Sequence, residues 1–588
     1  MTRLPNTFEI GLVCAGAVSG GAYTAGAMDF LIEALDAWYA AKRDDPGSVP
    51  GHDVLIRALA GASAGSMCSA IGAVALAGDF PPVRPDDLSG AERNPFYNSW
   101  VSAIDIADLL TTDDLQGASP TLKSILNSRK LSAIVDGVLS LGLPPRPRAY
   151  LAQEVSVRLT VGNLRGVPYE IRAKGSPNAA HGMMEHSDYM GFIAQYPSGR
   201  ETPYRPTEEY RLPAMASAGD PNWAMLGQSA LGSGAFPLFL EPRRLRHAPY
   251  PEVYARRKIA IVGERCRLDE EIQDRRPELQ AAVDDCYRVR AETIEPVSRD
   301  GARDYEFVVV DGGVFDNEPL ELARTALAGP LDHNPRSGDK AFRAVVMIDP
   351  FLETLECAPI PADEPIWKIG GRLLTAWKMD ARFDPEELAL ANTPNNFSRF
   401  LLAPSRGEPR ADADGRPPPN PAHPLAAGGL SGFLGFFDRS YRHHGYMLGR
   451  RNMQRFLQRH FVLPEGNDLF AGVWTDAQRT YWGWVSEEGT RMLPIVPLVP
   501  RLHPEKSERA AEPLPRWPDV VLDVERIGRK IRVRLDRVFR ITVRGSGLSW
   551  LMRALAIIGW WIFARGLISR KALAALRKAL ADQDLPSR

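Results

Sequence analysis

The first 80 residues alternate between strand-like and helix-like stretches, and small residues form the turns between them. A strand candidate at Phe8–Cys14 precedes a helix from about Gly21 to Lys42, and a second at Val54–Ala60 precedes a helix from Ser63 to about Ala77. Three further β-rich runs follow along the chain: Val155–Asn163, Phe307–Val310 and Ala344–Ile348. Because repeated strand–turn–helix units build a helix-covered sheet, the sequence predicts an α/β fold with helices on both faces.

The turn after the second strand candidate reads Gly-Ala-Ser-Ala-Gly, from Gly61 to Gly65. A serine on a tight strand-to-helix turn is strained, and its hydroxyl is exposed at the N-terminus of the next helix. The dipole of that helix favours developing negative charge. Ser63 is therefore a candidate nucleophile, and the N–H of Ala64 is a candidate oxyanion donor. The alternative is an ordinary helix start at which Ser63 is only the N-cap.

The turn after the first strand candidate is a glycine loop, GAVSGG, from Gly16 to Gly21. Such a loop at the start of a helix points backbone N–H groups at an anion. A dinucleotide-binding turn is disfavoured because Val18 occupies the central glycine position of G-x-G-x-x-G, and no Lys-Ser/Thr follows as in a nucleotide P-loop. An oxyanion-binding loop and a plain tight turn both remain open.

A third motif, Asp311-Gly312-Gly313, follows the β-rich run Phe307–Val310. A carboxylate at the C-terminal end of one strand lies in the layer where it can face a serine at the end of another. Taken alone, Asp-Gly-Gly is also an ordinary turn signature.

In this combination the sequence resembles the patatin-like phospholipase family, in particular its bacterial branch, over about residues 7–350. The matching segments are GAVSGGAYTAG (Gly16–Gly26), GASAGS (Gly61–Ser66), TVGNLRGVPY (Thr160–Tyr169), ALGSGAFPLFLEP (Ala230–Pro242) and DGGVFDNEPLELA (Asp311–Ala323), the last with Asn317 and Pro319 at the family's offsets. The resemblance implies a three-layer α/β/α patatin-like sheet with helical insertions and a basic C-terminal extension.

The resemblance also implies a serine acyl hydrolase that releases fatty acid from phospholipids or related lipid esters, without cofactor or metal. Ser63 would be the nucleophile and Asp311 the base, with no histidine. The implied oxyanion hole consists of backbone N–H groups: Gly16, Ala17, Val18, Ser19, Gly20 and Ala64. The implied supporting glycines are Gly61, Gly65, Gly312 and Gly313. Many family members carry Arg or Lys where this chain has Gly20. A catalytically weak lipid-binding or regulatory module and a lipid acyltransferase are the alternatives.

Histidines and cysteines offer weaker candidates. The pair His443–His444 could serve a histidine triad, but it falls in a charged stretch that we expect to be a surface helix. His181 and His186 are five residues apart and do not align on one helical face, so we expect solvated loop residues rather than metal ligands. Cys14 and Cys68 flank the two glycine turns, where packing alone explains them.

The charge is distributed unevenly along the chain. The whole chain has 71 Lys and Arg against 72 Asp and Glu, which makes a generally basic nucleic-acid binder unexpected. Residues 519–588 contain 15 Lys and Arg but 6 Asp and Glu, a net charge of +9 that leaves −10 for residues 1–518. Within this tail, Arg529–Arg544 alternates basic and apolar residues, as in a half-buried strand or hairpin with a basic face. Trp550–Leu580 has the pattern of an interfacial helix. Peripheral contact of 519–588 with an anionic membrane and packing of this region against the rest of the chain both remain open.

Composition breaks divide the chain into three expected regions. These are a catalytic region at 1–400 with a charged insertion at about 264–302, a Pro-rich loop and mainly helical extension at 401–500, and the basic amphipathic region 519–588, preceded by a linker at Arg501–Pro518. The longest strongly apolar run, Ala554–Ala564, is too short to span a bilayer. With no signal peptide recognised and scattered cysteines, we expect a cytoplasmic protein, peripheral on the inner face of the membrane.

Overall fold

A computed structural model gives the arrangement of most of the chain. It describes residues 4–117, 121–172, 180–203, 205–248, 253, 259–261, 292–294, 305–328, 334–351, 369, 395–407, 424–507, 510–547, 549–561 and 565–588. Apart from 292–294, the charged insertion expected at about 264–302 lies outside these residues, as does most of the Pro-rich loop.

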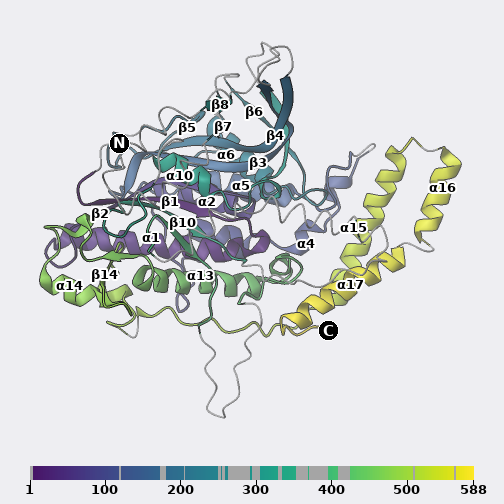
Figure 1. Ribbon diagram of the computed structural model, residues 1–588. Helices are drawn as coiled ribbons and strands as arrows, with labels where there is room; N and C mark the ends of the chain where they lie inside the picture. The colour runs from purple at the N-terminus through teal and green to yellow at the C-terminus, as the bar shows by residue number, and fades with distance from the viewer. Residues whose placement is uncertain are drawn as a thin grey trace.

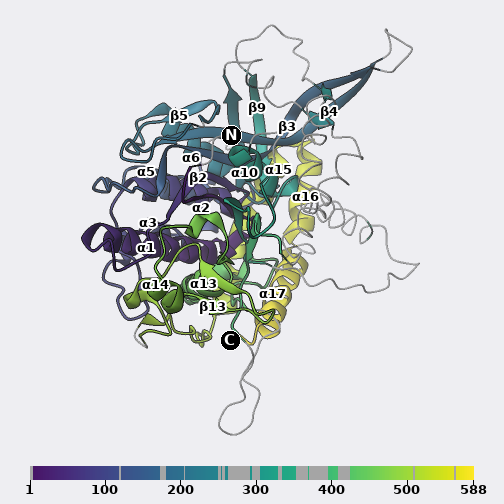
Figure 2. The same ribbon diagram turned by 60° about the vertical axis from the view of Figure 1, so that its left-hand side comes forward.

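The centre of the fold is a nine-stranded sheet in the order β11-β10-β1-β2-β3-β4-β5, from which β9 and β6 continue beside β3. Its strands are β1 (Thr7–Cys14), β2 (Asp53–Gly61), β3 (Leu151–Arg172), β4 (Ala180–Gln195), β5 (Tyr210–Leu212), β6 (Arg243–His247), β9 (Tyr305–Asp311), β10 (Arg343–Ile348) and β11 (Arg399–Leu402). The run from β11 to β3 is parallel, whereas β4 and β9 are antiparallel to β3. Beyond the sheet, β3 and β4 extend as a long hairpin (Figure 2).

Two small sheets lie outside this one. They are β12 (Val462–Pro464), β14 (Arg491–Pro494) and β13 (Trp484–Val485) in one, and β7 (Ile259–Ile261) with β8 (Glu292–Ile294) in the other. All five predicted strands are present in the large sheet, as β1, β2, β3, β9 and β10. The prediction of an α/β fold is confirmed.

Helices cover both faces of the large sheet. On one face α10 (Leu320–Ala328) packs Leu320 and Leu327 against β1, β2 and β10. On the other face lie α1 (Gly21–Asp44) and α2 (Ala64–Ala77), the two helices predicted after the glycine turns. Figure 1 shows α10 and α1 on opposite sides of the sheet. The other α-helices of seven or more residues in the described part of the chain are α5 (Arg129–Leu139), α6 (Pro221–Ser233), α13 (Arg439–Arg459), α14 (Asp476–Trp482), α15 (Val524–Gly545), α16 (Trp550–Gly559) and α17 (Arg565–Asp582).

Helix α13 lies alongside α1, so that α1 is enclosed between the sheet and α13 (Figure 2). The two backbones approach closely at glycines, because a Cβ on Gly26 would lie 1.9 Å from the carbonyl oxygen of Tyr446 and one on Gly449 would lie 2.1 Å from that of Tyr23. The prediction of a surface helix around His443–His444 is therefore wrong. Its arginines had suggested exposure, but Arg442 and Arg450 are buried, and they donate to the carbonyl of Gly435 and to the carboxylate of Asp29.

A buried ionic cluster joins α13 to α1. Arg450 contacts Asp29 at 2.6 Å, Glu33 at 2.7 Å and Glu512 at 2.6 Å. Burial raises the pKa of Asp29 and of Glu512, although Arg450 opposes the rise. Burial acts in the same direction on Glu33, but Arg450 and Arg84 outweigh it and lower the pKa of that carboxyl. One guanidinium thus compensates several carboxylates that water does not reach.

Two expectations for the C-terminal part are corrected. Arg529–Arg544 is not a strand or hairpin but part of α15, because its apolar residues also recur at helical spacing from Val524 through Ile527 and Ile531 to Ile541, and Asp523 caps the helix by accepting from the N–H of Arg526. Arg501–Pro518 is not a free linker, because Glu512 is buried against Arg450.

Replacing Arg450 with methionine should lower the free energy of unfolding by about 3–5 kcal/mol at neutral pH, because Asp29, Glu33 and Glu512 would lose their counterion. The pKa of each carboxyl would then lie higher in the folded than in the unfolded state. The folded state would bind protons that the unfolded state does not, so the deficit should shrink as the pH falls towards the ordinary carboxyl range. Urea denaturation at several pH values measures both effects.

Arg459→Met is the matched control, since Arg459 lies at the end of the same helix, α13, and forms an exposed ion pair with Glu505. An exposed pair of this kind contributes about 0–1 kcal/mol. Equal losses in the two variants would contradict the role given to the buried cluster.

Candidate active site

The sheet brings together Ser63 and Asp311 through the two strands that precede them. Gly61, at the end of β2, pairs with Leu159 of β3, and Asp311, at the end of β9, pairs with Val161 of the same strand. Since β2 runs parallel to β3 and β9 runs antiparallel to it, the C-terminal ends of β2 and β9 meet head to head along one edge of β3. Residues that are 248 positions apart in the chain thereby become neighbours.

Ser63 lies on the predicted turn between β2 and α2. Its backbone has φ 50° and ψ −120°, and its Oγ donates a hydrogen bond of 2.9 Å to Oδ2 of Asp311. A Cβ at Gly65 would lie 1.9 Å from the carbonyl oxygen of Cys14, so the close approach of β1 to this turn requires glycine there. The helix starts at Ala64 and directs its N-terminus at the serine.

Asp311 is held by its own loop. Its Oδ1 accepts a hydrogen bond of 2.8 Å from the N–H of Gly313, which fixes the carboxylate plane. Asn317 connects this loop to the glycine loop, because its backbone carbonyl accepts a hydrogen bond of 3.0 Å from the N–H of Gly16. Another atom lies closer than 3.0 Å to where a Cβ would stand at each of the other predicted supporting glycines: Gly61, Gly312 and Gly313.

Three of the predicted oxyanion donors in the glycine loop already donate to backbone carbonyls of the protein. Gly16 N–H donates to the carbonyl of Asn317, Ser19 N–H to that of Gly432 and Gly20 N–H to that of Ala17. No hydrogen bond to the part of the chain that the structure describes engages the N–H groups of Ala17, Val18 and Ala64. Of the six predicted oxyanion donors, these three therefore remain free to bind an oxyanion.

Two residues at or next to these free N–H groups have strained backbones. Val18 has φ +45° and Ser63 has φ +50°, and neither is a glycine. Such conformations are disfavoured for side chains with a Cβ and most of all for β-branched ones. Residues held in them cluster at functional sites.

A loop from the distant C-terminal part supports the glycine loop. Ser19 contacts Gly432 through both its N–H and its hydroxyl, and the N–H of Gly435 donates to that hydroxyl at 3.1 Å. The supporting loop has left-handed backbone at three successive residues, 430–432. No motif in the sequence pointed to this contact.

A short chain of buried hydroxyls supports the turn from behind. The N–H of Ser63 donates to Oγ of Ser233 at 2.9 Å, Ser233 donates to Ser66 at 2.7 Å, and Ser66 donates to the carbonyl of Gly61 at 2.7 Å. Ser233 ends α6, within the segment ALGSGAFPLFLEP, so its small-residue composition was the available signal.

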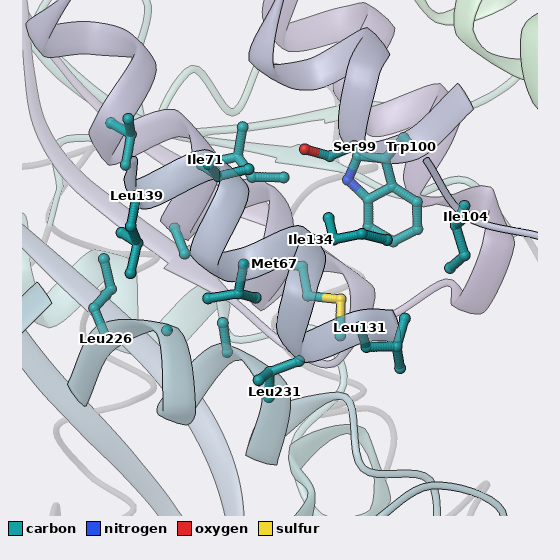
Figure 3. Close-up of a pocket in the computed structure, with 16 residues that line it drawn as sticks. Met67, Ile71, Ser99, Trp100, Ile104, Leu131, Ile134, Leu139, Leu226 and Leu231 are labelled. Carbon is teal, nitrogen blue, oxygen red and sulfur yellow. The ribbon is translucent and has the colours of Figure 1, made fainter. Parts of the chain in front are cut away.

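An apolar cavity of about 60 Å³ opens beside α2. Met67, one helical turn after Ser63, projects into it together with Trp100 and Leu231 from other elements (Figure 3). Apart from the Ser99 hydroxyl and the Trp100 indole nitrogen, the lining is apolar. The remaining lining residues are Ala70, Ile71, Val74, Ile104, Leu131, Ile134, Val135, Val138, Leu139, Leu226, Gly227 and Ala230.

The histidines of the sequence are placed elsewhere. Nδ1 of His443 lies 2.8 Å from the Tyr97 hydroxyl, and burial lowers the pKa of His444 to about 3, so it is neutral in the core. His181 and His186 are not loop residues as predicted but lie on β4, which the extended pairing with β3 places there. Among the described residues, no three His, Cys, Asp or Glu side chains gather in a way that could hold a metal ion.

Cys14 and Cys68 are buried free thiols beside the site. Burial raises the pKa of Cys14 to about 12 and raises that of Cys68 as well, so both thiols are protonated at neutral pH. Neither has the thiolate character of a nucleophile.

Gly65→Ala should lower the free energy of unfolding by about 2 kcal/mol or more, because its Cβ would collide with the β1 backbone. Gly137→Ala is the control, since Gly137 also lies in a helix but has nothing within 4 Å of its Cβ position. That change should raise stability by about 0.5–1 kcal/mol. Thermal and urea denaturation would refute the close approach if both variants gained stability.

No family model matches the sequence. The uncharacterized protein y4iI of Sinorhizobium fredii (strain NBRC 101917 / NGR234) is 34% identical to it over 543 residues, which cover 87% of this chain and 72% of that protein. A match of this identity and extent exceeds what a shared motif would produce. The chain therefore belongs to the same family as y4iI.

Proposed function

We propose that this protein is a serine acyl hydrolase that releases fatty acid from phospholipids or related lipid esters, with the three-layer architecture of the patatin-like phospholipases. The observation that carries the proposal is the 2.9 Å hydrogen bond from Ser63 Oγ to Asp311 Oδ2, made by a serine on a strained turn at a helix N-terminus. A nucleophile within reach of its base is the arrangement that covalent catalysis needs.

In the proposed acylation, Oγ of Ser63 attacks the ester carbonyl carbon while its proton passes to Asp311. The tetrahedral intermediate collapses as the ester C–O bond breaks, and the alcohol leaves with the proton from Asp311. In deacylation, Asp311 takes a proton from water, whose oxygen attacks the acyl-enzyme. The fatty acid then departs and Ser63 recovers its proton.

The proposed oxyanion site uses the N–H groups of Val18 and Ala64, with Ala17 beside them. All three are free of hydrogen bonds to the described residues, and Ala64 is the first residue of α2, where the helix dipole adds to the stabilisation of negative charge. The strained φ of Val18 fits a loop held for this purpose. The proposed site has no side-chain cation at loop position 20, where Gly20 stands in place of the Arg or Lys of many patatin-like proteins.

The apolar cavity supports the proposal that the substrate is a lipid. Met67, one turn along α2 from the nucleophile, lines the cavity, and the cavity offers an acyl chain few polar groups to desolvate. A soluble, polar acyl group would gain little in such a lining. We propose that the acyl chain of the scissile ester enters this cavity, whose volume of about 60 Å³ is smaller than a long acyl chain and must widen to hold one.

Ser63→Ala and Asp311→Asn should each lower fatty-acid release from phospholipid vesicles by about 10³-fold or more, because either change removes half of the pair. A fluorophosphonate probe should label Ser63 in the wild type, with the site located by mass spectrometry. Ser140→Ala, at an exposed serine, is the control and should be fully active.

Retained activity in Ser63→Ala would eliminate this serine as the nucleophile. A wild type inert towards phospholipids and simple esters alike would favour the lipid-binding or regulatory module. Transfer of the acyl group to added alcohols in preference to water would favour the acyltransferase.

Ala70→Phe, which fills the cavity from a half-buried position on α2, should lower hydrolysis of a palmitoyl ester by about tenfold and leave a butyryl ester within about twofold of wild type. Ala41→Phe is the control, at a half-buried position on α1 outside the cavity. A loss independent of chain length would exclude the cavity as the acyl site.

A further inference from the structure

The three C-terminal helices form an arm that stands away from the sheet at one end of the molecule, with α16 farthest out (Figure 1). The base of α15 packs on α17 through an apolar cluster that includes Val524, Leu573 and Leu580. Helix α16 folds back on the outer half of α15, where the rings of Trp560 and Phe539 stack 4.3 Å apart. The Trp560 indole also donates to a carboxylate on α15, at Asp536.

The opposite side of α16 is apolar and exposed. Leu551, Leu555 and Ile558 share one face at i, i+4, i+7 spacing, and 53%, 55% and 52% of their surfaces are accessible. Trp550, at the start of the helix, is 80% exposed. Large apolar side chains gathered in this way mark an interaction surface.

The net charge of the arm indicates the chemistry of the partner. Residues 519–588 carry +9 and the rest of the chain −10, so the arm is basic on an acidic body. Exposed basic residues on its helices include Arg526, Arg529, Arg540, Arg544, Arg570 and Lys571. Tryptophan and aliphatic side chains among arginines and lysines suit the boundary between acyl chains and anionic headgroups.

The length of the helices limits how the arm can bind. Helix α16 has 10 residues, and no helix among the residues that the structure describes is both long and apolar enough to cross a bilayer. A helix of this length can lie in the interface with one face in the acyl layer.

The base of the arm is connected to the walls of the candidate site. Ile527 and Ile531 of α15 pack against the same apolar cluster as Val18 of the glycine loop and Met67 of α2. Arg534, buried in the body, fastens α15 there through hydrogen bonds of 2.8 Å to Asp114 and 2.7 Å to the carbonyl of Ile125. The base of the arm is thus packed against residues next to the candidate site.

We propose that the arm docks the protein on an anionic bilayer, with the exposed face of α16 inserted at the interface and the surrounding arginines and lysines on the headgroups. The surface is separate from Ser63 and Asp311, so the inference does not depend on the proposed hydrolysis.

The test is co-sedimentation of the full-length Ser63→Ala protein with phosphatidylcholine vesicles that contain or lack phosphatidylglycerol, at increasing NaCl concentration. Because lipid cannot be hydrolysed through Ser63 in this background, binding is measured apart from catalysis. Binding should require phosphatidylglycerol and weaken with salt. Replacing Leu551, Leu555 and Ile558 together with serine should weaken it by at least about tenfold.

The matched control replaces three similarly exposed apolar residues of the body, Leu88, Leu164 and Val485, with serine. It should bind like the parent protein, and circular dichroism checks that both triple variants are folded. Equal binding by the α16 variant and its parent would overturn the proposal. Absence of parent-protein binding to anionic vesicles would also overturn it. In that case, gel filtration in which the parent is a dimer and the α16 variant a monomer would assign the α16 face to a dimer interface.

Discussion

The edge of β3 is the constraint on which the candidate site depends. β2 and β9 approach along that edge from opposite directions and end within two residues of each other in the register of β3. A slip of β9 by one residue would turn Asp311 to the other face of the sheet and leave Ser63 without its partner. The glycines around the two turns follow from this meeting, because three backbone segments share a space without room for a Cβ.

Much of this could be predicted from sequence because it is encoded locally. β1 and β2 are mostly apolar, with Glu9 and Arg57 as interruptions, and the turns after them consist of residues that tolerate crowding. Both strands, both helices and the position of Ser63 therefore follow from short windows. Asp311 was placed correctly at a strand end. The local pattern did not indicate that β9 runs antiparallel to β3 and meets β2 end to end. Strand direction depends on connections between distant segments, which a local pattern does not contain.

The remaining differences have the same origin. The arginines of α13 suggested a solvated helix. Arg450 instead contacts two carboxylates on α1 and the carboxylate of Glu512, and only the tertiary structure brings these groups together. The tail around Arg534 fits both a two-residue and a helical period, and the apolar cluster against the body selects the helix. The loop at Gly432 left no sequence signal, because a serine or glycine contact does not require a motif. The hydroxyls behind Ser63 left only the small-residue composition around Ser233.

The contact between Ser19 and Gly432 spans 413 residues, and it sets the order in which the site is completed during biosynthesis. A ribosome adds about 5–20 residues per second, so the glycine loop emerges about 20–80 s before the segment that supports it. Through that interval the nascent chain holds Ser63 without a finished loop beside it, and for most of it without Asp311. A chain that could act on the cell's own lipids would acquire that capacity only when nearly three quarters of it had been translated.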